Sequence, residues 1–316
     1  MGILCGTRAS NQETSHMTIP LAQLKTWSGQ GSVTQSKNTY ATVKSALEDV
    51  DAPYKSRNFK VFLQGSYGND TNIYSESDVD VIIRYDGEFY YDVKQTAENE
   101  QAAFHAAYPD SNTYAYKDFK EHVVQALRNK FGDSVKPGAK AIKIESNGNR
   151  RNADVIVAFE FRRYFHFKSL YNENHVAGMC FFDSGGNRIA NYPKQHCENL
   201  TTKHQAAGNN LKPLIRIFKN MRSKMIEEGL IAKGSAPSYY VEGLLYNIPT
   251  DQFSGDFQDT TLRVLQWLNK TTDRSEFLCA NEQYYLLREN LPTCWSCADG
   301  ANFIAAASKL WDDWYG

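Results

Sequence analysis

Two aspartates separated by one residue are the first feature of this 316-residue sequence that suggests a chemistry. Asp78 and Asp80 stand at the start of Val79 to Ile83, a short run rich in β-branched residues that predicts a strand. Because residues i and i+2 of a strand point to the same face, the two carboxylates are expected to project together. Paired carboxylates repel one another unless a cation joins them, and ligation by oxygen alone suits Mg²⁺ or Mn²⁺.

Asp154 is the candidate for a third metal ligand. It is a lone acid in the otherwise apolar run Ala153 to Phe159, where an isolated carboxylate is costly unless metal ions stabilise it. Three acids and two ions would let one ion activate an attacking hydroxyl and the other stabilise a leaving pyrophosphate. Glu76, two residues before Asp78 at the polar entrance of its strand, remains an alternative ligand.

A Gly-Ser turn, Gly65 and Ser66, precedes the Asp-x-Asp pair and follows the apolar run Phe59 to Leu63. Glycine lets the backbone approach a triphosphate closely, while the serine and the following N–H groups can donate hydrogen bonds to it. Gly68 relaxes the turn further. Either motif alone is commonplace, since strands often end at glycine and acids often line solvated faces. The order strand, Gly-Ser, strand, Asp-x-Asp and distant Asp predicts phosphoryl transfer.

The elements that position these residues follow from hydrophobic periodicity. Apolar residues at spacings of three, four and seven predict helices, and short β-branched or aromatic runs predict strands. The two kinds are mixed as far as Tyr192, and beyond it only helices are expected. Helices are predicted over 32–50, 93–107, 116–131, 211–226, 237–247, 260–269 and 298–311, and strands over 59–63, 79–83, 140–144, 153–159 and 179–182.

This distribution predicts an α/β fold (α+β) made of two lobes. Residues 17–192 would form a catalytic lobe with a mixed sheet and a long first helix, and residues 193–316 a helical, nucleotide-binding lobe, with the active site in the cleft between them. Residues 1–16 are interpreted as a disordered leader, and whether Met17 is the natural start stays open. Gly185-Gly186-Asn187 is expected to turn a hairpin rather than to hold a phosphate, because no lysine and helix follow it.

The composition, 41% hydrophobic and 22% charged with a net charge of −1, is that of a soluble globular protein. The six cysteines are irregularly placed, which predicts reduced thiols in a cytoplasm. The sequence has no apolar run long enough for a signal peptide or a membrane span, so we expect no export and no membrane association. Charge is nevertheless segregated. Residues 65–100 hold nine acids and two bases, whereas residues 194–233 hold eight bases and three acids. These segments indicate a metal-binding and a triphosphate-binding region, and the near-zero total argues against a long nucleic-acid partner.

The combined motifs resemble the nucleotidyltransferase superfamily that includes DNA polymerase β, with its Gly-Ser and [DE]-x-[DE] signature. Two helical segments, Leu211-Lys-Pro-Leu-Ile-Arg-Ile-Phe-Lys-Asn-Met-Arg222 and Ala236-Pro-Ser-Tyr-Tyr-Val-Glu-Gly-Leu-Leu245, resemble bacterial CD-NTases. These are cyclic-oligonucleotide synthases related to cyclic GMP-AMP synthase and oligoadenylate synthase. Leu24-Lys-Thr-Trp-Ser-Gly-Gln-Gly31 is similar to their opening segment, so that the resemblance covers nearly everything from Met17 onward.

In that family a helical lysine and the serine of a Ser-Tyr pair contact the donor triphosphate, and the tyrosine stacks on a base. The resemblance implies these roles for Lys219, Ser238 and Tyr239, with Tyr240 as an alternative stacking residue. From the residues alone, Arg216 and Lys219 lie three apart on one helix face and would present positive charge to a nucleotide. A solvated helix face is the ordinary alternative.

Animal cyclic GMP-AMP synthase differs in carrying a zinc-binding insertion and basic surfaces for DNA. This sequence has a single Cys-x-x-Cys, Cys294 and Cys297, and a loose group of His196, Cys197 and His204 without a fourth ligand. Neither group supplies the four ligands of a structural zinc site, so a zinc site is a weak alternative at both. No activation by DNA is therefore predicted.

The resemblance implies an enzyme that joins nucleoside triphosphates (ATP, GTP or both, with other bases open) through attack of a 2′- or 3′-hydroxyl on an α-phosphate. Pyrophosphate is released, two Mg²⁺ or Mn²⁺ ions serve as cofactors, and the product is a cyclic di- or trinucleotide. Such bacterial enzymes are associated with CBASS-type antiphage signalling, in which a separate effector binds the product. Two alternatives stay open: a nucleotidyltransferase that makes linear oligonucleotides or modifies a macromolecule, and an inactive nucleotide-binding regulator.

Overall fold

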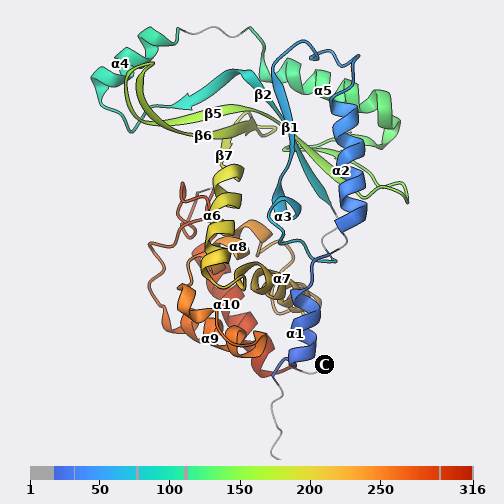
Figure 1. Cartoon of the computed structure of the whole chain (residues 1–316), viewed down its shortest axis with the longest axis vertical. Coiled ribbons are helices and arrows are strands. Elements are labelled where there is room, and N and C mark those ends of the chain that lie inside the picture. Colours follow the sequence, from blue (N-terminus) through green and yellow to red (C-terminus); the bar gives the residue numbers. More distant parts are fainter. Residues whose placement is uncertain (1–17, 32, 76–77, 110–112, 292, 315–316) are drawn as a thin grey trace, which may run out of the picture.

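The computed structural model describes residues 18–314 apart from positions 32, 76–77, 110–112 and 292. Two lobes are stacked along the long axis of the molecule, the first built on a β-sheet and the second made of helices (Figure 1). The predicted leader 1–16, the start at Met17 and the alternative ligand Glu76 lie outside the described residues.

Helices and strands are mixed along the first part of the described chain, and helices predominate in the rest. In chain order, the α-helices are α1 (Leu21–Ser28), α2 (Val33–Leu47), α3 (Gly65–Gly68), α4 (Glu98–Ala107), α5 (Tyr116–Phe131), α6 (Pro193–Ala206), α7 (Leu211–Glu227), α8 (Ser238–Tyr246), α9 (Phe257–Lys270) and α10 (Cys297–Asp312). The strands are β1 (Phe59–Leu63), β2 (Val79–Asp92), β3 (Val135–Pro137), β4 (Ile142–Ile144), β5 (Ala153–Ser169), β6 (Asn172–Phe182) and β7 (Arg188–Asn191). Short 3₁₀ turns occupy Gly132–Ser134 and Thr250–Gln252.

The described strands form one mixed sheet in the order β1, β2, β5, β4, β3, with β6 beside β5 and β7 beside β6. β2 and β5 are parallel, and the other pairs are antiparallel. Val79 and Val81 at the start of β2 are completely buried, as expected for the central strands of a covered sheet. The predicted α/β fold with a mixed sheet is confirmed.

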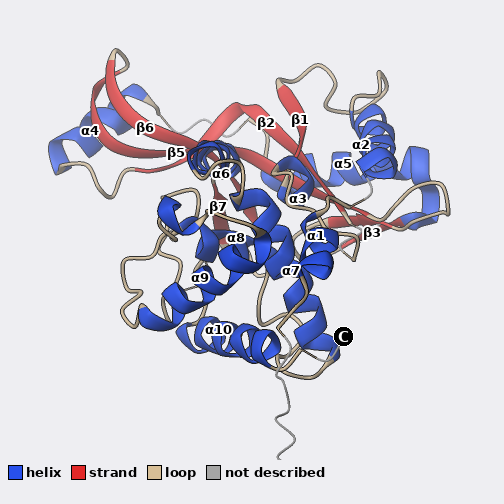
Figure 2. Cartoon of the chain, turned by 60° about the horizontal axis from the view of Figure 1, so that its bottom comes forward, coloured by secondary structure: helices blue, strands red, loops and turns tan. Residues whose placement is uncertain are grey.

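Helices α2 and α5 cover one face of this sheet (Figures 1 and 2). They pack on each other and on β2 and β5. Their buried residues recur one turn apart, as Val43 and Leu47 do in α2 and Phe119 and Val123 in α5. This spacing places one apolar stripe of each helix on the sheet, which explains why both helices could be predicted from the sequence.

Helix α7 is the centre of the helical lobe, where it packs against α1, α6, α8 and α10. Leu214, Ile215 and Phe218 of α7 are completely buried in one continuous apolar core. In the described part of the chain, no helix combines the length and apolar character that crossing a bilayer requires.

The structure departs from the expected division at residues 17–192, because α1 belongs to the helical lobe by its packing. It contacts α7 and α9, and Leu24 is completely buried in their core. The ring of Trp27 meets that of Trp314 edge-on, with centroids 5.5 Å apart. A short amphipathic helix buries its apolar face wherever a complementary core accepts it, whatever its place in the sequence.

Other differences concern the lengths of elements. β2, β5 and β6 extend well beyond the expected 79–83, 153–159 and 179–182 as an arm of the sheet, and α4 packs against β5 there (Figure 1). Helix α6 was not expected, because its sequence is polar and only His196 and Leu200 are buried in it. The Gly-Ser turn is the single helical turn α3. The predicted hairpin at 185–187 is confirmed, since it joins β6 to β7 with Gly186 at a φ of +77°.

Candidate active site

Asp80 and Asp154 are paired residues in the parallel ladder of β2 and β5, so that their side chains lie on the same face of the sheet. Asp78 is the residue immediately before β2, and Asn152 Nδ2 donates a 3.1 Å hydrogen bond to its Oδ1 atom. The three predicted metal ligands therefore come from the starts of two neighbouring strands.

Electrostatics at this end of the sheet favours a bound cation. Burial raises the pKa of the Asp154 carboxyl, and the Asp78 carboxylate raises it further, while Lys143 opposes them. A hard divalent cation such as Mg²⁺ would relieve this repulsion, and carboxylate oxygens are the donors that it prefers. Among the described residues, no three acidic, histidine or cysteine side chains are gathered closely enough to hold one ion.

Gly65 combines a left-handed backbone conformation with a clearance that only a residue without a β-carbon provides. Its φ of +71° lies in the left-handed region, which glycine adopts without strain. A β-carbon built at this position would collide with the Oδ2 atom of Asp80. Helix α3, with Ser66 as its second residue, therefore begins directly against one of the predicted metal ligands.

A pocket of about 1210 Å³ opens between the two lobes, with walls from β1, α3, β2, β6, β7, α6 and α8. Six predicted site residues line it: Gly65, Ser66, Asp78, Asp80, Ser238 and Tyr239. The other three, Asp154, Arg216 and Lys219, do not. The structure thus brings the Gly-Ser turn, the Asp-x-Asp pair and the Ser-Tyr pair to one cavity, although the Ser-Tyr pair is far from the other two motifs in the sequence.

Ser238 is the first residue of α8, and its hydroxyl is oriented by a buried arginine. Arg222 Nη1 donates 3.0 Å hydrogen bonds to Ser238 Oγ and to the carbonyl oxygen of Ala236. The N-terminal end of a helix also carries partial positive charge, which favours an anion. This end of α8 is therefore suited to a phosphate.

The two tyrosines after Ser238 both line the pocket but have different neighbours. The Tyr239 ring is stacked on the imidazole of His196, with centroids 5.0 Å apart and planes at 20°. The Tyr240 ring is stacked on Trp295, with centroids 5.9 Å apart and planes at 7°. Both rings also pack against the apolar core of the helical lobe, and only Tyr240, the alternative stacking residue, is stacked on the buried Trp295.

Arg216 and Lys219 lie on α7 where it faces the sheet lobe, and both hold backbone there. Arg216 Nε donates a 2.6 Å hydrogen bond to the carbonyl oxygen of Ser28, and Nη1 a 2.5 Å bond to that of Asp70. Lys219 is completely buried, with Nζ 2.8 Å from Glu242 Oε1. The predicted cationic face is covered by the segment that follows α3, which is why neither side chain reaches the pocket.

Glu242 lines the pocket and was not singled out by the sequence interpretation. It lies one helical turn after Ser238, inside the apolar segment Val241 to Leu245 of α8, and it is only 2% exposed. A single acid among apolar residues on a helix is the signal that could have identified it, because a buried carboxylate requires a partner.

The two groups weighed as zinc ligands show no metal-binding arrangement in the described residues. Cys294 and Cys297 are free thiols, the first partly buried and the second exposed. His196 is buried against α8, whereas His204 accepts a 3.3 Å hydrogen bond from the backbone of α7. No metal role is assigned to either group.

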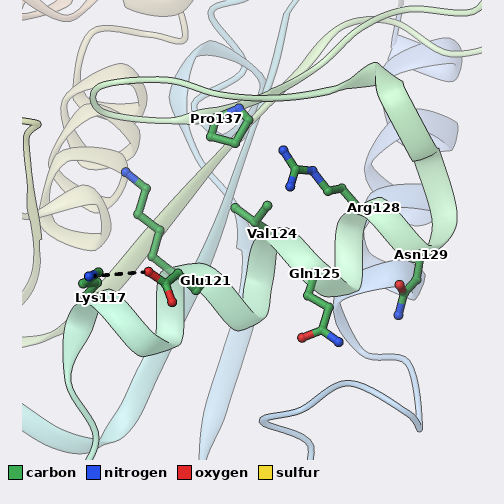
Figure 3. Close-up of a pocket in the computed structure, with 8 residues that line it drawn as sticks. Lys117, Glu121, Val124, Gln125, Arg128, Asn129 and Pro137 are labelled. Carbon is green, nitrogen blue, oxygen red and sulfur yellow. Dashed lines mark ion pairs between the residues drawn. The ribbon is translucent and has the colours of Figure 1, made fainter.

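A second, smaller hollow of about 570 Å³ lies along α5 beside Pro137 (Figure 3). Lys117 and Glu121, one turn apart on α5, form a 3.9 Å ion pair at its edge. None of the predicted site residues lines this hollow. It is separate from the candidate active site.

Models of two protein families match the chain. The model of the cGAS/DncV-like nucleotidyltransferase C-terminal helical domain matches residues 198–312. The model of the nucleotidyltransferase domain matches residues 43–175. The two matched segments fall in the helical lobe and the sheet lobe.

Relatives match over nearly their whole length. The chain is 38% identical over 300 residues to the cyclic UMP-AMP synthase of Rhodothermus marinus, which covers 94% of this chain and 99% of that protein. It is 35% identical over 304 residues to the cyclic nucleotide synthase CdnE01 of Staphylococcus haemolyticus, which covers 94% of this chain and 100% of that protein.

Solved structures agree with these relatives. That of the Rhodothermus marinus CdnE c-UMP-AMP synthase with Apcpp and Upnpp has a TM-score of 0.83 at 36% identity, over 94% of this chain and 98% of that chain. That of the Elizabethkingia meningoseptica CdnE cyclic dinucleotide synthase with GTP and Apcpp has a TM-score of 0.73 at 29% identity, over 93% and 98%.

Proposed function

Since this chain belongs to the family of cGAS/DncV-like nucleotidyltransferases, we propose that it joins nucleoside triphosphates into a cyclic di- or trinucleotide with release of pyrophosphate. The observation that supports this most directly is the pocket between the lobes, which is lined by the Asp78–Asp80 pair, the Gly65–Ser66 turn and the Ser238–Tyr239 pair. Its volume of about 1210 Å³ also exceeds the ~300–1,000 Å³ typical of a site for one small ligand, as two nucleotides require.

The acids Asp78, Asp80 and Asp154 would hold the divalent ions on which this family generally depends, and we propose two Mg²⁺ ions, or Mn²⁺ in their place. When bound there, such ions activate an attacking hydroxyl and stabilise a leaving pyrophosphate. Asn152 supports this set by holding Asp78 through its 3.1 Å hydrogen bond.

The remaining lining residues would bind the donor nucleotide. The N–H groups of the Gly65–Ser66 turn and the Ser66 hydroxyl donate to the triphosphate, and Ser238 at the start of α8 donates to it from the other lobe. The ring of Tyr239 stacks on the base. Arg216 and Lys219, which were predicted to contact the same nucleotide, hold the segment that follows the turn.

Both a 2′- and a 3′-hydroxyl remain candidate attackers, and ATP, GTP and pyrimidine triphosphates remain candidate substrates. The relatives are cyclic UMP-AMP, dipurine and dipyrimidine nucleotide synthases by name. We further propose that the product acts as a second messenger that binds a separate effector in bacterial antiphage (CBASS-type) defence.

High-resolution mass spectrometry of products from an equimolar mixture of the four NTPs with Mg²⁺ or Mn²⁺ tests the proposal. We expect phosphatase-resistant cyclic products that disappear in the isosteric Asp78→Asn/Asp80→Asn variant, with Asp118→Asn on α5 as a matched control. Linear, phosphatase-sensitive products or a nucleotide mass added to a macromolecule would instead identify another nucleotidyltransferase. Nucleotide binding without pyrophosphate release would identify a regulator.

A further inference from the structure

A row of charged side chains crosses the sheet on the face that carries the predicted metal ligands. Asp80 of β2 is paired with Asp154 of β5. Asp154 is paired in turn with Lys143 of β4, and Lys143 with Lys136 of β3. Directly paired residues of neighbouring strands lie about 5 Å apart, with their side chains on the same face of the sheet. The register therefore continues the two acids into two cations.

The residues next to the two lysines show which face of the sheet the lysines occupy. Ile142 and Ile144, on either side of Lys143, are completely buried in the core that the sheet shares with α5. Pro137, which follows Lys136, borders the hollow along α5 (Figure 3). Since successive side chains of a strand alternate between the two faces, both lysines point away from α5. Both are exposed.

The two ammonium groups are placed at a cost in free energy that a bound anion would offset. Like charges directly opposite each other in an antiparallel pair are destabilising, and neither ammonium forms an ion pair with a carboxylate of the described residues. A lysine on an edge strand can prevent pairing with another chain, which would account for Lys136. It does not account for Lys143, because β4 lies between β3 and β5.

The proposed donor site lies on the other side of the acids. The Gly65–Ser66 turn follows β1, which neighbours β2 on the side away from β5. The order across the sheet is therefore the turn, Asp80, Asp154, Lys143 and Lys136. In phosphoryl transfer, the attacking oxygen and the leaving group lie roughly in line on opposite sides of the phosphorus. A donor triphosphate at the turn thus leaves the side of the lysines to the attacking nucleotide.

The β3–β4 hairpin that carries the lysines reaches the pocket between the lobes. Lys140, in the turn between the two strands, is one of the residues that line the pocket. Lys136 and Lys143 do not line it, but lie exposed on the sheet face beside it. A nucleotide whose base and ribose occupy the pocket would therefore extend its 5′-phosphates over them. Ammonium groups form strong, charge-assisted hydrogen bonds with phosphate oxygens.

We propose that Lys143 and Lys136 bind the 5′-triphosphate of the acceptor, which is the nucleotide whose hydroxyl attacks, and thereby select a phosphorylated acceptor over a nucleoside. This inference rests on the proposed function, because it assigns a site to one nucleotide of that reaction. It differs from a role of Lys143 as a mere counter-ion of Asp154, since a counter-ion would affect every acceptor alike.

The first experiment compares acceptors with and without a 5′-triphosphate. 2′,3′-Dideoxynucleoside triphosphates serve as donors, since they lack the attacking hydroxyls. The acceptors are nucleosides or α,β-methylene nucleoside triphosphates, among them the non-hydrolysable ATP analogue. In Lys136→Met/Lys143→Met we expect the KM of the methylene triphosphates to rise about tenfold and that of the nucleosides to stay within about twofold. Lys136→Arg/Lys143→Arg should keep both KM values near those of the wild type.

Two results of this experiment would overturn the proposal. One is an equal rise of both KM values or an equal fall of kcat with both acceptors, as a counter-ion of Asp154 predicts. The other is an unchanged KM for the methylene triphosphates. The matched control is Lys117→Met on α5, at the opposite face of the sheet, whose ammonium forms a 3.9 Å ion pair with Glu121. It should leave both KM values within about twofold.

The second experiment needs no turnover, so it separates failure of this inference from failure of the proposed function. Acetylation of lysines in the wild type is followed by mass spectrometry, with Mg²⁺ and either the four α,β-methylene NTPs or the four nucleosides. Saturating methylene NTPs are expected to slow acetylation of Lys136 and Lys143 about fivefold relative to the exposed Lys168 of β5, and nucleosides are not. Such protection in a protein that forms no product would support this inference and count against the proposed function. Product formation without protection would overturn the inference alone.

Discussion

The Asp80 carboxylate lies so close to Gly65 that a β-carbon at position 65 would collide with its Oδ2 atom. A predicted metal ligand and the predicted phosphate-binding turn are therefore in van der Waals contact before any substrate binds. The chain can bring them together only because position 65 has no side chain and adopts a φ of +71°.

Gly65→Ala is accordingly expected to lower the rate of product formation by about 100-fold or more, because Asp80 must move to admit the methyl group. Gly148→Ala is the control, since Gly148 also has a positive φ, of +84°, but a β-carbon there would meet nothing within 4 Å. Steady-state rates and melting temperatures of both variants separate backbone strain from the collision. Equal loss of activity in the two variants would argue against a role for the Gly65–Asp80 contact.

Divalent metal ions are expected to stabilise the folded protein by binding to the carboxylates of Asp78, Asp80 and Asp154. Because Asp154 is half-buried beside the Asp78 charge, Asp154→Asn should raise the melting temperature at pH 7 in EDTA by about 2 °C or more. Excess Mg²⁺ should raise that of the wild type but have little effect on Asp78→Asn/Asp80→Asn. Calorimetric scans with and without Mg²⁺ measure both effects. An Mg²⁺-induced shift that persists in the double variant would place the ion elsewhere.

Asp86 is expected to stabilise the folded protein in a pH-dependent way. Burial alone would raise its pKa, but hydrogen bonds from Arg84 and Lys60 hold the pKa below its usual value. A lowered folded-state pKa stabilises the protein above the unfolded-state value, and this stabilisation is lost as the pH falls through the folded-state value. Asp86→Asn should therefore cost about 1–2 kcal/mol of unfolding free energy at pH 7. Urea titrations should show the difference shrinking below about pH 4, and a constant difference would refute this cause.

The two pocket tyrosines are expected to differ in function. Tyr239→Leu should weaken nucleotide binding by about tenfold, since an aromatic platform contributes ~1–3 kcal/mol per stacked base. Tyr240→Leu should instead lower the melting temperature, because the Tyr240 ring is stacked on the buried Trp295. Calorimetry with the non-hydrolysable ATP analogue and thermal scans distinguish the two. A larger loss of affinity in Tyr240→Leu would transfer the stacking role to Tyr240.

Local patterns predicted the elements whose contacts are periodic. The limits of β1 (Phe59–Leu63) and α5 (Tyr116–Phe131) agree with expectation, because β1 is a short apolar run that ends before Gly65 and the buried residues of α5 recur at helical spacing. The part of β5 beyond residue 159 was not predicted, because Arg162 and Arg163 interrupt its apolar run. In the structure the Arg162 guanidinium lies over the ring of Phe89 and pairs with Glu160 at 2.7 Å. These partners compensate for the polar residues within the strand.

The site residues could be predicted only in part, again because sequence analysis detects local patterns. Gly65, Ser66, Asp78 and Asp80 are close in sequence, so that spacing alone indicates their chemistry. The partners of Glu242 are distant, since Asn69 is 173 positions away from it. Pairing across such a separation leaves no local pattern in the sequence. The positive charges of α7 were therefore expected to face a ligand, whereas in the structure Lys219 pairs with Glu242 of the same chain.

The packing of α1 has a consequence for the order in which the protein can fold during synthesis. Among the described helices α1 leaves the ribosome first, yet Trp27 packs against Trp314 near the other end of the chain. The sheet lobe can form as soon as its own strands have emerged. The contacts of α1 with α7 and α9 wait for those helices, and its contact with Trp314 comes last, so the core of the helical lobe is completed only when the end of the described chain has been made.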